Sequence, residues 1–100
     1  MTPTREELML AVNEADWHGL RAHLERGGLI LVAGDLDIVD VGLSVANDDA
    51  AAVGGWIEAQ KLNKPTAEQI AAWASFREKL LYCLIVSPYV LIQEKPAVFQ

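Results

Sequence analysis

The chain has 100 residues, of which 52% are hydrophobic, and carries a formal net charge of −6. This length suits one domain over residues 1–100, and so short a chain buries only about 60–65% of its unfolded surface. The negative charge disfavours binding to nucleic acids and to anionic membranes, because both attract clustered Lys and Arg. We therefore expect neither a nucleic acid nor a membrane as a partner.

Two helices are predicted before residue 29. Thr4 and Glu7 have the spacing of a capping box, and the apolar residues that follow recur at helical spacing. This first helix should end near residues 13–15. Asp16 can cap a second helix, which the two glycines at 27–28 would stop.

The middle of the chain predicts one strand followed by a helix. Residues 29–33 form an apolar run of strand length, and Asp37 can cap a third helix that reaches about Asn47. That helix has apolar residues on two sides. We therefore place it at the centre of the helical layer.

A fourth helix is expected over residues 50–60, with Val53, Trp56 and Ile57 buried. It contains the glycine pair 54–55, which costs roughly 1 kcal/mol per glycine relative to alanine. A close approach to another helix or to the sheet would offset that cost. Residues 62–65 read as a loop.

The last predicted elements are a fifth helix and a pair of strands. Thr66 and Gln69 repeat the capping-box spacing and open the helix. Residues 80–93 are almost entirely apolar and rich in β-branched side chains, so they predict strands; they are too short for a membrane span. Pro88 lies either at the tip of a tight hairpin, with a cis peptide bond, or in one long edge strand that it kinks; we favour the hairpin. Residues 95–100 should be a frayed tail.

Together these elements predict an α+β fold, with about five helices packed on a small two- to three-stranded sheet. The strands would be residues 29–33 and the two arms around Pro88. We expect the helices to cover one face of this sheet well. The second face would then need cover from a partner, and a two-fold homodimer is the simplest way to supply it. The competing explanation is that the N-terminal helices fold over the second face and complete a monomer.

Six segments of the chain resemble a family of short bacterial proteins catalogued as domain of unknown function 2288. In chain order they are HLERGGLILV (23–32), DLDIVDVG (35–42), VANDD (45–49), the tryptophan at 56, KPTAEQIAAW (64–73) and LIVSPYVLIQ (84–93). The resemblance covers nearly the whole chain. It implies a bacterial source and a stand-alone domain, and it implies no activity and no functional residues.

Acidic residues gather in one region, since residues 27–60 contain six acids and no Lys or Arg. Asp35 and Asp37 follow a predicted strand, as in haloacid-dehalogenase-like phosphatases, but the surrounding residues do not fit that pattern and turn and cap roles explain both. Asp35, Asp37 and Asp40, with the pair 48–49, could bind a hard cation, although their spacing is not that of an EF-hand. We expect no metal and no cofactor.

Three aromatic residues could line a ligand-binding cleft: Trp56, Trp73 and Tyr89. Packing is the ordinary explanation for all three. Cys83 lies in an apolar strand, which is typical of an inert thiol, and the absence of a second cysteine suits a reducing, cytoplasmic setting. The helix at 67–74 contains no Lys or Arg, so a winged-helix DNA-binding role is disfavoured.

These patterns favour a non-enzymatic protein-interaction module, with a homodimer as one form of it. The alternative is a small-molecule-binding protein or enzyme that uses a pocket between the third helix and the sheet. A pocket with convergent polar groups would favour the alternative, and a broad apolar patch would favour the first.

Overall fold

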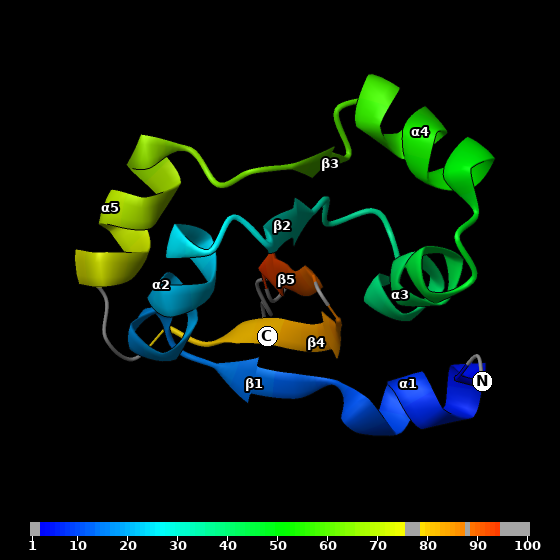
Figure 1. Cartoon of the computed structure of the whole chain (residues 1–100). Helices are drawn as coiled ribbons and strands as arrows, with labels where there is room; N and C mark the ends of the chain where they lie inside the picture. Colours follow the sequence, from blue (N-terminus) through cyan, green and yellow to red (C-terminus); the bar gives the residue numbers. More distant parts are fainter. Residues whose placement is uncertain (1–2, 76–78, 88, 95–100) are drawn as a thin grey trace, which may run out of the picture.

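A mixed five-stranded sheet runs through the centre of the protein (Figure 1). The computed structural model describes residues 3–75, 79–87 and 89–94. In chain order its elements are α1 (Arg5–Ala11), β1 (Asn13–Ala15), α2 (Trp17–Glu25), β2 (Leu29–Val32), α3 (Ile38–Ala46), α4 (Ala50–Glu58), β3 (Leu62–Asn63), α5 (Ala67–Ser75), β4 (Leu81–Val86) and β5 (Tyr89–Glu94). The strand order is β1-β4-β5-β2-β3, with β2 and β5 parallel and the other neighbours antiparallel.

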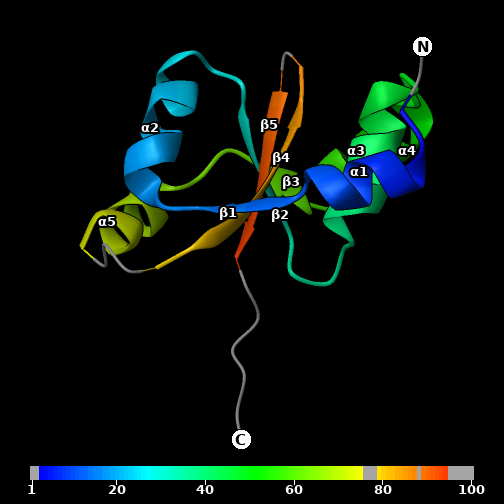
Figure 2. The same ribbon diagram turned by 90° about the horizontal axis from the view of Figure 1, so that it is seen from below.

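Helices cover both faces of the sheet, which makes three layers (Figure 2). On one face, α2 and α5 pack over a core that contains Trp17, Leu20 and Trp73. On the other face, α1, α3 and α4 lie over a second core around Val41, Leu84 and Leu91. The expectation that helices cover only one face is therefore wrong, because α2 and α5 fold over the second.

The α+β class and the five helices are confirmed, but the sheet has five strands rather than two or three. The two additional strands are its short edges. β1 occupies residues predicted to end the first helix, and β3 lies in the predicted loop. Three and two residues are too few to show an alternating pattern. Their pairing partners, such as Cys83 for Asn13, are also distant in sequence.

The predicted helix caps are present. The side chains of Asp16 and Asp37 accept hydrogen bonds from backbone N–H groups of the first turns of α2 and α3. Asp49, for which no cap was predicted, does the same for α4. Thr66 and Gln69 form a reciprocal capping box at the start of α5. These bonds satisfy N–H groups that have no partner within their own helix, so each helix begins where its cap predicts.

Three helices end in the same way, with a residue of positive φ that closes a Schellman motif. In α2 this residue is Gly27, at φ 79°. In α3 it is Asp48, at φ 55°, and in α4 it is Gln60, at φ 61°. In each helix the N–H of this residue and that of the next one return to carbonyls of the last turn.

The third helix lies at the centre of its layer, as predicted, with α1 and α4 on its two sides (Figure 1). It buries Ile38, Val39, Val41 and Gly42. A Cβ added to Gly42 would lie 2.6 Å from Cδ2 of Leu84, so this glycine lets α3 approach the sheet closely.

The fourth helix does not pack as predicted. It has no buried residue: Val53 and Trp56 are half-buried, and 55% of Ile57 is exposed. A Cβ added to Gly54 or Gly55 would have no neighbour within 4 Å. The close approach expected at this glycine pair is therefore absent.

The C-terminal strands form the favoured hairpin, since β4 and β5 pair from Leu81↔Glu94 to Val86↔Tyr89. The geometry of Pro88 and the predicted tail at residues 95–100 lie outside the described residues. Among the helices of the described chain, none has the length and apolar character needed to cross a membrane.

Candidate ligand-binding site

A hollow of about 580 Å³ lies between α4, the C-terminal half of α3 and the sheet. We call it the α4 hollow. Its apolar lining consists of Ile30, Val45, Ala50, Val53, Ile57, Leu62, Tyr89 and Leu91, and its polar lining of Ser44, Asp48, Asp49, Asn63 and Lys64.

The floor of the hollow is built by two parallel strands in register. Ile30 on β2 is the Cα partner of Leu91 on β5, and successive side chains along a strand point to opposite faces. Tyr89 is two residues from Leu91, so it lies on the same face, where it is 42% exposed. The sheet thus presents two aliphatic side chains and one aromatic side chain to the hollow.

The roof of the hollow is α4, which has no fully buried residue. Val53 and Ile57 line the hollow, yet neither is buried. Val53 and Trp56 are only partly buried where they pack against the core, and a hollow remains between the helix and the sheet. A helix of mostly apolar residues ordinarily buries one face, so the α4 hollow is apolar surface left uncovered within the described chain.

Polar groups stand at the rim of the hollow. Asp49 caps α4 by accepting a hydrogen bond from the N–H of Ala52 at 3.1 Å. The amide nitrogen of Asn63 donates to the carbonyl of Gln60 at 2.7 Å. The side chains of Asp48 and Lys64 make no hydrogen bond or ion pair within the described chain, so both are available to a ligand.

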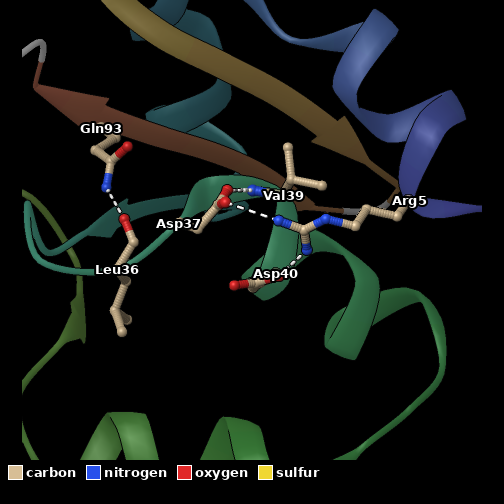
Figure 3. A network of polar contacts seen from close by, with 6 residues as sticks. All are labelled: Arg5, Leu36, Asp37, Val39, Asp40 and Gln93. Atoms are coloured by element: carbon tan, nitrogen blue, oxygen red, sulfur yellow. Dashed lines mark hydrogen bonds and ion pairs between the residues drawn. The ribbon is translucent and has the colours of Figure 1, made fainter.

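A second hollow, of about 440 Å³, lies beside α1 at the carboxyl ends of β2 and β5. Here Arg5 forms ion pairs with Asp37, at 2.9 Å, and with Asp40 (Figure 3). Asp37 also accepts from the N–H of Val39 at 2.8 Å. Both acids are thus occupied in joining α1 to the start of α3, which is a structural role.

Gln93 is the buried polar side chain of the described chain and also lines this second hollow. Its amide nitrogen donates to the carbonyls of Ala33, at 2.8 Å, and Leu36, at 2.6 Å. These carbonyls belong to the turn between β2 and α3. Gln93 therefore holds that turn against β5, and the interior amide has its hydrogen-bond partners.

The six residues predicted to form a site lie in separate places. Asp35 pairs with Lys61, whose hydrogen bond lowers the pKa of the carboxyl group. Asp37 and Asp40 share Arg5, as described. Trp56 packs half-buried against the core beneath α3, and Tyr89 alone lines the α4 hollow.

The remaining candidate, Trp73, is buried on the opposite face of the sheet. Its ring lies 5.7 Å from that of Trp17, and its Nε1–H donates to Glu94 at 2.9 Å. It therefore belongs to the core rather than to a cleft. Cys83 is likewise buried, and the loss of water around it raises the pKa of its thiol, as expected for an inert cysteine.

Within the described residues, no three or more His, Cys, Asp or Glu side chains lie close enough together to hold a metal ion. The lining of the α4 hollow also lacks His and Cys, so a nucleophile paired with a histidine base is not available there. Its chemistry is that of a binding site: an apolar floor and roof with a few charged and polar groups at the rim.

Most residues of the α4 hollow were missed by sequence reasoning. Ile30 and Leu91 lie in predicted strands, and Leu62 and Lys64 lie in a predicted loop. One signal was present: the glycine pair 54–55 lowers the stability of an apolar helix, and a helix that fails to pack closely leaves room beneath it.

Comparisons with known proteins agree with this fold. The family model described as "Protein of unknown function (DUF2288)" matches residues 3–94. The solution NMR structure of PA1075 from Pseudomonas aeruginosa is similar to this chain, with a TM-score of 0.78 and 28% sequence identity. The match covers 93% of this chain and 87% of that one. None of the curated proteins matches.

Proposed function

This chain belongs to the DUF2288 family, as its resemblance predicted, and we propose that it is a non-enzymatic binding protein that holds a mainly apolar small molecule in the α4 hollow. One observation carries the proposal: a helix of largely apolar residues stands over an apolar strand surface without closing on it. The alternative interpretation of the sequence expected a pocket between the third helix and the sheet, and this hollow, between α4, the C-terminal half of α3 and the sheet, supports that interpretation.

The size and lining of the hollow support a small-molecule ligand. Sites for small molecules usually measure about 300–1,000 Å³ and are lined by hydrophobic side chains with a few polar groups. The α4 hollow, at about 580 Å³, has both properties. Covering its apolar surface would contribute roughly 25 cal/mol for each Å² removed from water.

A neutral, polarity-sensitive naphthalene dye such as prodan tests this proposal. We expect the dye to bind with a blue-shifted emission, and Ala50→Phe to weaken binding about tenfold because Ala50 lines the hollow. Ala51→Phe is the matched control, since Ala51 is also exposed at the start of α4 but lies outside the lining. Failure of the dye to bind, or equal weakening by both variants, would contradict the proposal.

A second candidate is protein interaction through the same surface, including a homodimer. The original reason for it, an uncovered second sheet face, no longer holds. Its support is instead the exposure of Ile57 and Tyr89 at the α4 hollow. Light scattering after size exclusion, at about 100 μM protein, tests self-association. If both the parent chain and Ile57→Asp have the mass of a monomer, the homodimer proposal is contradicted.

We propose that the protein is located in the bacterial cytoplasm. The buried, unpaired Cys83 suits a reducing compartment, and the resemblance suggests a bacterial source. Fractionation of the native cell, followed by detection with an antibody against the chain, tests this location.

A further inference from the structure

The α4 hollow lies in the most acidic part of the protein. Residues 27–60 contain six acids and no Lys or Arg. Asp48 and Asp49 stand at the corner between α3 and α4, while Lys64 follows β3 and also lines the hollow. The other nearby cation, Lys61, is paired with Asp35. The charge on the rim is therefore net negative.

Helix dipoles do not reverse this sign. The carboxyl end of α3 and the amino end of α4 meet at the same corner, so their partial charges oppose each other. The side-chain carboxylate of Asp49 is already bound to the N–H of Ala52. The carboxylate of Asp48 is the acid at this corner with no partner in the described chain.

Asp48 occupies a position where glycine is the usual residue. It has positive φ at the end of α3, in the Schellman motif that α2 closes with Gly27. Glycine adopts this conformation without the steric cost of a Cβ atom. Aspartate is less favourable than glycine for this backbone conformation. Here, however, it places a free carboxylate on the lining of an apolar hollow.

We propose that the ligand is an apolar amine, whose ammonium group pairs with Asp48 while its hydrocarbon body covers Ile30 and Leu91. This inference rests on the proposed function of the α4 hollow and specifies the ligand class. The charge of the rim would select an amine over an acid with the same body, because the acid would be repelled at the same corner.

Three probes with a common naphthalene body test this selection: 1-naphthylmethylamine, 1-naphthalenemethanol and 1-naphthaleneacetate. We expect the amine to bind roughly fivefold more tightly than the acid, with the alcohol between them, as suits a partly solvated ion pair. Intrinsic tryptophan fluorescence and calorimetry measure the affinities. Raising the salt concentration should reduce the difference between amine and acid and leave the alcohol unchanged.

Two substitutions of Asp48 distinguish an effect on the preference for the amine from an effect on the stability of the fold. Asp48→Asn keeps the shape of the side chain, and Asp48→Gly supplies the preferred residue of the motif. Both should abolish the preference for the amine while the alcohol still binds, and Asp48→Gly should leave the fold at least as stable. Glu58→Gln is the matched control: it removes one exposed acid from α4 outside the lining and should keep the preference.

The outcomes distinguish this inference from the function on which it rests. If no probe binds, the proposed function itself fails. If all three bind equally, or the acid binds best, the hollow is a binding site but Asp48 does not select an amine. A preference that survives Asp48→Asn would likewise overturn the role of Asp48.

Discussion

The helices α3 and α4 are consecutive, have nine residues each and are both mostly apolar, yet they pack in opposite ways. The third helix buries four residues against the sheet, and the fourth buries none. Their glycines show the same contrast. Gly42 faces Leu84 with no room for a Cβ atom, whereas Gly54 and Gly55 face open space.

This contrast shows that apolar composition alone does not decide which helix joins the core. A glycine on the face that meets the sheet lets α3 lie close to β4. In α4 the glycines lie where they gain no contact, so they only add conformational freedom to the unfolded chain. The hollow beneath α4 is the structural result.

The largest predicted effect on stability comes from replacing one valine by alanine, and it should differ between α3 and α4. Val41→Ala should lower the free energy of unfolding by about 2 kcal/mol, because Val41 is fully buried and its loss leaves a cavity. Val53→Ala should cost about 0.5 kcal/mol or less. Urea denaturation followed by circular dichroism measures both. Equal losses would mean that α4 packs as tightly as α3.

Adding a methyl group to the glycines should give effects of opposite sign. Gly42→Ala should destabilise the fold by about 1–2 kcal/mol, since the new Cβ would overlap the packed side chain of Leu84. Gly54→Ala and Gly55→Ala should each stabilise it by about 0.5–1 kcal/mol, because neither Cβ meets a neighbour. Thermal unfolding compares the three variants. Destabilisation by either α4 substitution would contradict the open environment described for these glycines.

The smallest effect concerns the ion pair that joins the end of α4 to the turn before α3. Lys61 lowers the folded-state pKa of Asp35 below its ordinary value of 3.8. A lowered pKa stabilises the fold above the unfolded pKa, and this contribution is lost as the pH falls through the folded value. Lys61→Met should therefore be slightly less stable than the parent at neutral pH, and the difference should shrink as the pH falls below 3.8 and through the lowered pKa of Asp35.

Titration of the Asp35 carboxyl group by NMR provides the direct measurement. Its midpoint should rise towards 3.8 in Lys61→Met. Lys64→Met serves as the control, because Lys64 makes no ion pair within the described chain and its removal should leave the Asp35 midpoint nearly unchanged. An identical midpoint in the parent and Lys61→Met would show that the pair does not form in solution.

Local signals in the sequence predicted the helices and the hairpin well. Caps such as Asp16, Asp37 and Thr66 act within one turn of chain, so their consequences follow from neighbouring residues. The short strands β1 and β3 are held by partners far away in sequence, and no local pattern reveals them. The layer of α2 and α5 was missed for the same reason.

The candidate site was harder to predict than the fold. The acidic residues Asp35, Asp37 and Asp40 drew attention by their spacing, but each is paired with a cation from another part of the chain. Among the six candidate residues, Tyr89 lines the α4 hollow and the other five lie elsewhere. A cavity forms where the side chains of packed elements do not fill the space between them. The sequence shows which side chains are available but not how distant elements pack.

The position of the last hairpin also bears on how the protein folds during synthesis. β4 and β5 lie between β1 and β2 in the sheet, although β1, α2 and β2 are joined in sequence more than forty residues earlier. Among the described strands, β1 therefore has no sheet partner until β4 has been synthesised, and β2 has only the two-residue strand β3 until β5 follows. Contacts of such high sequence separation slow folding and leave early segments exposed. We infer that the sheet is completed late in folding, when the β4–β5 hairpin inserts between β1 and β2.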